Sequence, residues 1–236
     1  MHILTEYHNS KSPDRNAEYV YCIKKNIENP TIDGIHLFVE NDTVVDFVEN
    51  QKKVTIIRKN QRPTYGEFIR YAAEKLDSNI CIIANTDIVI SDGFETLSKE
   101  YLKDKFISLS RWDSAGKNIS HYDFAYSQDA WVFLSPISIP NSDFNLGVLG
   151  CDNRIAYEAH SAGLDVRNPS GVLKTIHYHE SNYRTYSAHD TLKGKYLFVY
   201  NTDNLDSVPL KIICDPSTIG GAVTKVRADR EIKRNG

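Results

Sequence analysis

Along residues 1–90, short apolar runs alternate with segments in which apolar residues recur at helical spacing. The runs predict strands over residues 3–7, 34–40, 54–57 and 80–84. The helical spacing predicts helices over 14–27 and 64–76, the second with Thr64 as N-cap and Glu67 completing a capping box. Strands that alternate with helices favour an α/β fold with a largely parallel sheet.

The second half of the chain follows a different pattern. It predicts strands over residues 106–109, 130–134 and 173–176 and a helix over 152–162. Gly163 is the expected end of that helix. Beyond about residue 187, an aromatic strand candidate precedes a polar stretch and a charged end. We therefore expect one domain over 1–186 and, over 187–236, a C-terminal extension that wraps the same domain and ends in a frayed or linker-like segment.

Composition limits the class of protein. The 236 residues, 41% of them hydrophobic, can bury a sizeable core, and a net charge of -3 does not favour nucleic-acid binding. No apolar segment approaches the roughly 18 residues of a membrane span, and the first residues lack the features of a signal peptide, so the default location is cytoplasmic. The four cysteines have no Cys-x-x-Cys spacing and are expected to be reduced packing residues.

One apolar run is interrupted by a carboxylate. Residues 80–90 are hydrophobic except around Asp87. A buried parallel strand has such a run, and ligands of open α/β sheets bind at the carboxyl ends of the strands. Asp87 is therefore expected where a metal ion or a phosphate group would bind. The same three letters recur at Asn201-Thr202-Asp203, so an ordinary turn is the alternative.

Arginine occurs in two polar clusters that suit an anion or a sugar. Arg62 precedes the predicted helix start at Thr64, and both an arginine and a helix N-terminus favour phosphate. The alternative is an ordinary capped helix beside a solvated arginine. Arg111 precedes Trp112, whose ring can stack on a sugar or pack structurally.

Asp152 and a histidine pair complete the candidate chemistry. Asp152 follows a glycine turn at the start of a predicted helix, where a carboxylate can cap the helix or act as a general base. His177 and His179 alternate on a predicted strand and therefore share a face. Such a pair can bind a metal, although one member is often a core residue or a support for a ligand.

Taken in this order, these motifs resemble the GT-A nucleotide-sugar glycosyltransferases, and more closely the small glycosyltransferase domains encoded by chlorella viruses and related bacterial proteins. The resemblance covers about residues 3–186 and implies a Rossmann-like α/β fold with a mixed central sheet flanked by helices. The acidic motif of that family falls on Asn85-Thr86-Asp87. The family pattern usually begins with Asp, so Asn85 is a departure that leaves Asp87 as the main carboxylate.

The resemblance also implies roles for individual residues. Asp87 and His179, or less well His177, would hold a Mn²⁺ or Mg²⁺ ion that bridges the donor diphosphate, and Asp152 would be the catalytic base. The expected donor-binding residues are Thr5, Glu6, Tyr7, Arg62, Tyr65, Asn85 and Thr86. The expected contacts to the donor sugar or the acceptor are Arg111, Trp112, Gln128, Asp129, Trp131 and His177.

The implied activity is metal-assisted transfer of a hexosyl or deoxyhexosyl group from a nucleotide-diphosphate donor, with UDP expected, to a hydroxyl of a glycan or glycoprotein acceptor. Single displacement would invert the anomeric carbon. The setting would be viral or bacterial glycan biosynthesis, in the host cytoplasm if the source is viral. A metal-dependent hydrolase and a non-catalytic nucleotide-sugar or glycan-binding module stay open as alternatives, as does a place within a longer polypeptide.

Overall fold

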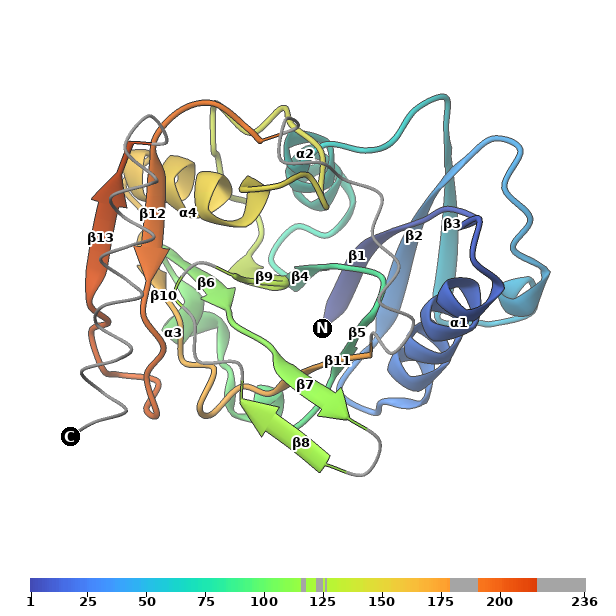
Figure 1. Cartoon of the computed structure of the whole chain (residues 1–236), viewed down its shortest axis with the longest axis horizontal. Coiled ribbons are helices and arrows are strands. Elements are labelled where there is room, and N and C mark those ends of the chain that lie inside the picture. Colours follow the sequence, from blue (N-terminus) through green and yellow to red (C-terminus); the bar gives the residue numbers. More distant parts are fainter. Residues whose placement is uncertain (116–117, 122–124, 126, 179–190, 216–236) are drawn as a thin grey trace.

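A mixed sheet runs through the centre of the computed structural model, which describes residues 1–115, 118–121, 125, 127–178 and 191–215. Within these residues, seven strands pair in the order β10-β6-β9-β4-β1-β2-β3 (Figure 1). They are β1 (His2–Tyr7), β2 (Gly34–Glu40), β3 (Val54–Lys59), β4 (Ile80–Ala84), β6 (Lys105–Leu109), β9 (Ala130–Leu134) and β10 (Asp165–Arg167). Strand β9 is antiparallel to β4 and β6, and the other pairings are parallel. The expected α/β fold with a mixed central sheet is confirmed.

Helices cover both faces of this sheet (Figure 1). They are α1 (Pro13–Glu28), α2 (Tyr65–Lys75), α3 (Lys99–Leu102) and α4 (Cys151–Ser161). Because side chains alternate along a strand, Leu4 of β1 packs in the core that includes α2 and α4, while Ile3 packs in the core that includes α3. Helix α1 packs through Tyr19 and Ile23 against β2.

The helices begin for the reasons that their sequences indicate. Thr64 caps α2: its Oγ1 accepts from the backbone N of Glu67 (3.2 Å), and the Glu67 carboxylate accepts from the backbone N of Thr64 (3.0 Å). Ser12 caps α1, with a proline in the first turn. The N-cap of α4 is Gly150, whose φ of 82° is the left-handed conformation that glycine adopts without strain.

A second sheet was only partly predicted from the sequence. Within the described residues its order is β5-β11-β7-β8, formed by β5 (Ile88–Ile90), β11 (Thr175–His177), β7 (Trp112–Ala115) and β8 (Asn118–His121). The apolar run over 80–90 is therefore two strands, because the chain turns after Ala84 and β5 pairs antiparallel with β11. Two short 3-10 helices lie elsewhere along the chain: η1 (Asp46–Val48) between β2 and β3, and η2 (Phe94–Thr96) after β5.

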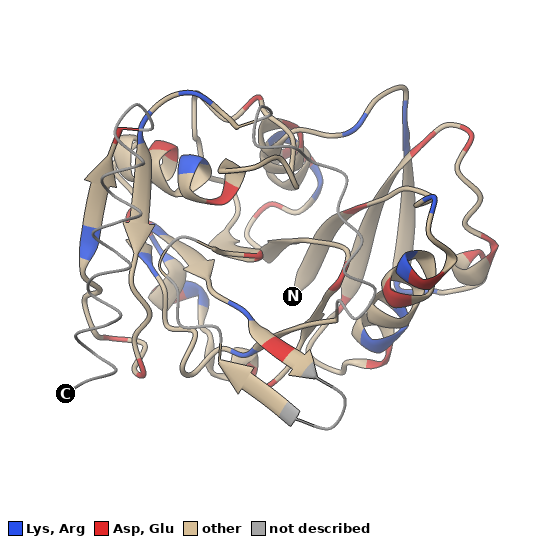
Figure 2. Cartoon of the chain, viewed as in Figure 1, with Lys and Arg blue, Asp and Glu red and all other residues tan. Residues whose placement is uncertain are grey.

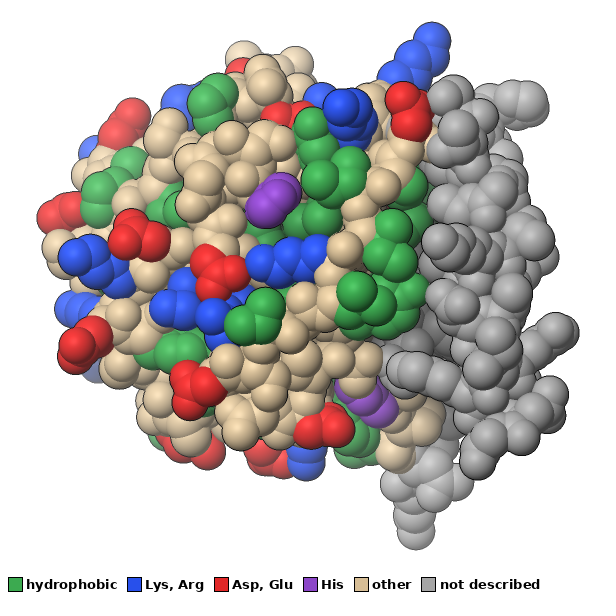
Figure 3. Space-filling view, turned by 90° about the vertical axis from the view of Figure 1, so that its left-hand side faces the viewer, with side chains coloured by type: hydrophobic (Ala, Val, Ile, Leu, Met, Phe, Trp, Pro, Cys, Tyr) green, Lys and Arg blue, Asp and Glu red, His purple; other side chains and the backbone are tan. Residues whose placement is uncertain are grey.

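A C-terminal hairpin packs on α4. It consists of β12 (Tyr196–Val199) and β13 (Lys211–Cys214), which pair antiparallel. Leu197 and Val199 share the core cluster of the α4 residues Ile155 and Ala159. Figure 3 shows hydrophobic side chains among charged ones on this side of the molecule. Residues 191–215 thus belong to the same body as the central sheet. The division of the chain at residue 187 stays a prediction. The charged end lies outside the described residues.

Two expectations from composition can be compared with the structure. The four cysteines are buried and free, as expected. A helix long and apolar enough to cross a membrane is not found among the described residues. Acidic and basic residues are interspersed along the chain, with both signs on α1 (Figure 2).

Candidate functional site

The carboxyl ends of the parallel strands meet at one edge of the central sheet. β1, β4 and β6 end there, and β9 begins there because it runs the opposite way. The backbone N of Asp129 donates to the carbonyl of Leu109 (3.0 Å), and the backbone N of Asn85 donates to the carbonyl of Asp129 (3.0 Å). The segments after β4 and β6 and before β9 are thereby held together at the edge where open α/β sheets bind their ligands.

Asp87 lies within a chain of ion pairs at this edge. Its Oδ2 accepts from the guanidinium of Arg15, in the first turn of α1, and lies 3.0 Å from Nε2 of His177 in β11. Nδ1 of His177 lies 3.0 Å from Oδ1 of Asp113 in β7. Asp87 is only 5% exposed and Arg15 only 8% exposed. The chain of ion pairs therefore ties α1 and the second sheet to the end of β4, with Asp87 and Arg15 buried and Asp113 partly exposed.

The chain of ion pairs continues to β6 and β9. Arg111 donates from Nε to Asp113 (2.8 Å) and from Nη1 to Oδ2 of Asp129 (2.9 Å). Oδ1 of Asp129 accepts from Nδ2 of Asn85 (2.6 Å). Asn85, the departure from the family pattern, thus positions Asp129. We call the connected set the Asp87 network, and its members are Arg15, Asp87, His177, Asp113, Arg111, Asp129 and Asn85.

Charge pairing displaces the pKa values of this network. Burial alone would raise the pKa of Asp87, but His177 and Arg15 hold it well below its usual range. Burial alone would lower the pKa of His177, but Asp87 and Asp113 raise it to about 9. Against the effect of burial, hydrogen bonds from His177 and Arg111 lower the pKa of Asp113 to about 2. At neutral pH these groups are therefore charged and mutually compensated.

Asp152, unlike Asp87, is hydrogen-bonded by backbone N–H groups and not by charged side chains. It lies in the first turn of α4, and its Oδ2 accepts from the backbone N of Gln128 (3.2 Å). Burial raises the pKa of Asp152 to about 7, with backbone N–H groups opposing that rise and Asp129 adding to it. Gly150 rather than Asp152 is the N-cap, and a Cβ on Gly150 would lie 2.4 Å from Oη of Tyr196. A carboxyl group with a pKa near neutrality suits proton transfer.

Glu6 and Arg62 form an ion pair at the end of β1. The guanidinium of Arg62 donates to both oxygens of Glu6, and its Nη2 donates to the carbonyl of Leu146 (2.8 Å). Oγ1 of Thr86 donates to the carbonyl of Glu6 (2.6 Å), so the pair lies beside the turn after β4. The Glu6 side chain is buried, whereas 38% of the Arg62 side chain is exposed. Arg62 is thus oriented and still accessible to an anion.

Several predicted site residues lie in the interior instead. Tyr65 and Trp131 are at most 1% exposed and pack edge to face in the core, with ring centroids 5.0 Å apart. Thr5 is buried and donates to the last carbonyl of β4 (2.8 Å). Gln128 is also buried, and its side chain donates to the carbonyl of Ala125 (2.8 Å). Because a ligand could reach the rings of Tyr65 and Trp131 only if the core opened, neither residue belongs to the proposed site.

Tyr7 and Trp112 are placed at the margins of the site. Tyr7 is buried, and its hydroxyl donates to Asn9 (3.3 Å) in the loop after β1. Trp112 stacks on the ring of His121, with centroids 4.6 Å apart, and its Nε1 donates to the carbonyl of Ser170 (2.8 Å). Alternation along β7 puts Trp112 and the next residue of the strand on opposite faces. The Trp112 ring is therefore not part of the Asp87 network.

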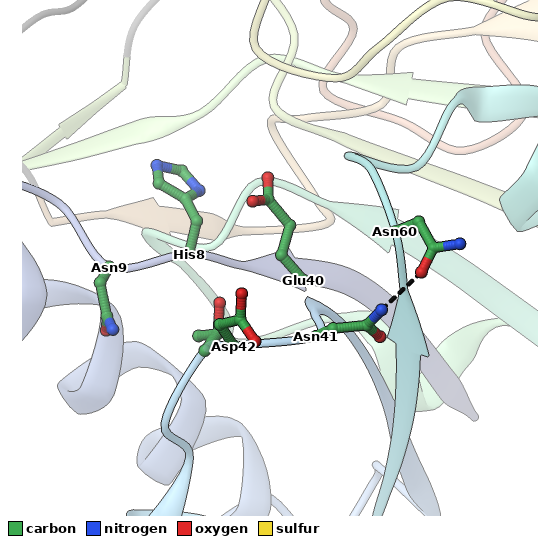
Figure 4. A pocket seen from close by; sticks show the side chains of 7 residues that line it. His8, Asn9, Glu40, Asn41, Asp42 and Asn60 are labelled. Atoms are coloured by element: carbon green, nitrogen blue, oxygen red, sulfur yellow. Dashed lines mark hydrogen bonds between the residues drawn. The ribbon is translucent and has the colours of Figure 1, made fainter.

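A pocket of about 360 Å³ opens where β1, β2 and β3 end. Figure 4 shows that His8 follows β1, that Glu40 closes β2, and that Asn41 is hydrogen-bonded to Asn60 after β3. Asn9, Asp42 and Thr43 also line it. Burial lowers the pKa of His8, so its ring is neutral at neutral pH. The pocket is rich in oxygen acceptors, which suits a ligand with N–H and O–H groups.

The described residues do not fit the divalent cation expected from the family resemblance. Oδ2 of Asp87 is bonded to Arg15 and His177. Among the residues that the structure describes, no group of three or more His, Cys, Asp or Glu side chains is arranged to hold a metal ion. His179, the other expected ligand, lies outside those residues. With Arg15 and His177 on its Oδ2, Asp87 does not offer a hard cation the free oxygen ligand that it needs.

Sequence reasoning missed three parts of this site. The helix over 14–27 was predicted from its apolar spacing, but nothing in that pattern indicated that Arg15 contacts Asp87, which is 72 residues away. Asp113 belongs to the same polar cluster of the sequence as Arg111, but nothing there indicated that it contacts His177. Glu40 ends a predicted strand, and that position at the carboxyl end of a parallel strand was the one available indication of the pocket.

Comparisons with known proteins add little to these observations. No family model matches the chain, and no curated protein matches it. Among solved structures, HddC from Yersinia pseudotuberculosis has a TM-score of 0.40 at 12% identity, covering 61% of this chain and 82% of that chain. HddC complexed with GMP-PN has a TM-score of 0.36 at 14% identity, covering 57% and 73%.

A further solved structure comes from Bacillus anthracis and is described as a putative glucose-1-phosphate thymidylyltransferase in complex with a sucrose. It has a TM-score of 0.43 at 8% identity, covering 71% of this chain and 85% of that chain. At these values the likeness says nothing about what this chain binds or does.

Proposed function

We propose that this protein is a glycosyltransferase that moves a sugar from a UDP-type nucleotide donor to a hydroxyl of a glycan or glycoprotein acceptor, with inversion. The observation that carries the proposal is Asp152, a carboxyl group with a pKa of about 7 beside the polar edge of the sheet. General bases work best when their pKa lies near the working pH. The order of motifs that resembles the GT-A glycosyltransferases supports the same residue.

In the proposed reaction, Asp152 accepts the proton of the acceptor hydroxyl while the hydroxyl oxygen attacks the anomeric carbon of the donor. The new carbon–oxygen bond forms on the face opposite the leaving group. The bond between the anomeric carbon and the diphosphate oxygen breaks, and the nucleoside diphosphate leaves with the electron pair. One displacement therefore inverts the configuration.

The nucleoside is proposed to occupy the pocket lined by His8 and Glu40. Carboxylate and amide oxygens there can accept hydrogen bonds from the N–H of a base and from ribose hydroxyls. The pocket directly follows β1, whose last residues include Glu6, the partner of Arg62. Arg62, with 38% of its side chain exposed, is the proposed contact for the diphosphate.

The donor sugar is proposed to lie between the diphosphate and Asp152. Asp129 lies near Asp152, whose pKa it raises, and is hydrogen-bonded to Arg111 and Asn85. Arg111, Asp129 and His177 are therefore proposed to shape the sugar and acceptor side of the site. No step of the reaction is assigned to a metal ion.

A donor and acceptor screen tests the proposal. The protein is incubated with UDP-, GDP- and dTDP-sugars and with glycan acceptors, while release of nucleoside diphosphate is followed and the product configuration is determined by NMR. We expect one donor class to give a glycoside of inverted configuration. A retained configuration would contradict the single displacement.

The same screen distinguishes the alternatives. Equal release of product with and without acceptor would favour a hydrolase. Donor binding without turnover in any acceptor mixture would favour a non-catalytic binding module.

A further inference from the structure

The guanidinium of Arg15 is engaged on every side. It donates to Asp87, to Glu18 (2.7 Å) and to the carbonyl of Tyr178 (3.4 Å), and its Nε donates to Oη of Tyr19 (3.1 Å). Its central carbon also lies 4.7 Å from the centroid of the Tyr19 ring. Because these partners come from α1, from the end of β11 and from the turn after β4, the group is fixed in front of the Asp87 carboxylate.

A divalent cation on Oδ2 of Asp87 would compete with Arg15 for that oxygen. Mg²⁺ binds carboxylate oxygens at about 2.0–2.1 Å, closer than the guanidinium and the His177 ring that Oδ2 already contacts. A cation there would also face the charge of Arg15 in a buried site, where repulsion is weakly screened. Asp113 and Asp129, the next carboxylates of the network, are themselves paired with Arg111. A cation on Oδ2 and the Arg15 ion pair therefore compete for the same oxygen, and the charge of Arg15 opposes a cation at this carboxylate.

We propose that Arg15 takes the place of a divalent cation at Asp87, and that the protein binds a nucleoside diphosphate without Mn²⁺ or Mg²⁺. Arginine is charged at every relevant pH, so the positive charge is always present and needs no supply of metal. The replacement of the cation by Arg15 concerns the protein alone, whereas the binding of nucleoside diphosphate rests on the proposed function.

The first experiment titrates Mn²⁺ into the protein without nucleotide and measures free Mn²⁺ by electron paramagnetic resonance. The proteins are the wild type, Arg15→Gln, and Arg70→Gln as a control that removes an arginine from the exposed Arg70–Asp143 pair. We expect Arg15→Gln to bind Mn²⁺ at least about tenfold more tightly than the wild type and Arg70→Gln to match the wild type. Adding Asp87→Asn to Arg15→Gln should remove the gain.

Equal Mn²⁺ binding by the wild type and Arg15→Gln would overturn the proposal. So would a Mn²⁺ site in the wild type that Asp87→Asn abolishes. The folded state of each variant is checked by urea unfolding before the titration.

The second experiment uses the wild type and therefore does not depend on whether Arg15→Gln folds. Binding of UDP and of GDP is measured by calorimetry in EDTA and in Mn²⁺. We expect the two conditions to agree within about twofold for the nucleotide that binds. A gain of about tenfold or more in Mn²⁺, lost in Asp87→Asn, would overturn the proposal. If neither nucleotide binds in either condition, the proposed function fails, and the Mn²⁺ titration still decides the role of Arg15.

Discussion

Asp87 and Asp152 are aspartates near the same edge of the same sheet, yet the protein displaces their pKa values in opposite directions. Asp87 is paired with Arg15 and His177, and its pKa lies well below the usual range. Asp152 accepts hydrogen bonds from backbone N–H groups and has Asp129 nearby, and its pKa is raised to about 7. Both groups are desolvated, so burial alone does not explain the difference.

The different environments of Asp87 and Asp152 show how one edge of the central sheet can hold both a structural ion-pair network and a candidate base. The Asp87 network compensates its charges internally and links α1 to strands of both sheets, which is a structural role compatible with ligand binding beside it. The carboxylate of Asp152 is held by backbone N–H groups, so its protonation can change near neutral pH. The proposed chemistry is therefore assigned to the carboxylate whose charge is less compensated.

The largest effect is expected where the proposed base is removed. Asp152→Asn keeps the shape but cannot accept a proton, so the transfer rate should fall by about 10²–10⁴-fold. Initial rates of nucleoside diphosphate release with donor and acceptor give the measurement. The matched control is Asp143→Asn, an exposed carboxylate in the segment before α4. If both variants keep the wild-type rate, Asp152 is not the base.

Removing the compensated carboxylate should affect stability instead. Asp87→Ala leaves Arg15 and His177 buried without their shared partner, and breaking a buried pair in this way costs about 3–5 kcal/mol. Urea denaturation of the wild type and the variant measures the free energy of unfolding. A loss below about 1 kcal/mol would mean that the Asp87 network is not a structural support.

The two kinds of carboxylate should also titrate in opposite senses. The folded pKa of Asp152 is raised from 3.8 to about 7, so its contribution to the free energy of unfolding falls as pH rises from about 4 to 7, by at most about 4 kcal/mol. The folded pKa of Asp113, in the Asp87 network, is lowered to about 2, so its contribution is present above about pH 4 and is lost as pH falls through 2.

Unfolding by urea at a series of pH values separates these contributions. Asp152→Asn should lose the decline between pH 4 and 7 and become more stable than the wild type at pH 8. If the difference in stability between the wild type and Asp152→Asn is the same at pH 5 and pH 8, the Asp152 carboxyl group is better hydrated than the structure indicates.

Much of the fold was predictable because its signals are local. The capping box at Thr64 and the apolar runs that became β1, β2 and β4 depend on neighbouring residues alone. The second sheet was not, since β5 is three residues long and finds its partner β11 more than eighty residues later. Periodicity over residues 80–90 could not show where one strand ends and the next begins.

The site was predictable only as a set of positions. Asp87, Asp129 and Asp152 were identified from the sequence, but their partners depend on strand order. Arg15 contacts Asp87 because α1 packs beside β5, and Asn85 contacts Asp129 because β9 is antiparallel to β4. Conversely, Tyr65 and Trp131 were placed at the site because their motif positions are near it, although their side chains lie in the core.

The smallest effect is expected for the Arg70–Asp143 ion pair, which differs from the Arg15–Asp87 pair mainly in its exposure. The side chains of Arg70 and Asp143 are 58% and 64% exposed, with 3.0 Å between Nη2 and Oδ1. Water and salt screen such a pair, so Arg70→Gln should change the free energy of unfolding by less than about 1 kcal/mol. Asp87→Ala is measured in the same urea series. If Arg70→Gln changes the free energy of unfolding only slightly, the stabilisation by the Asp87 network depends on its burial. If Arg70→Gln and Asp87→Ala lower the free energy of unfolding equally, ion pairing itself, and not desolvation, governs the stability of this protein. Burial would then not account for the different pKa values of Asp87 and Asp152.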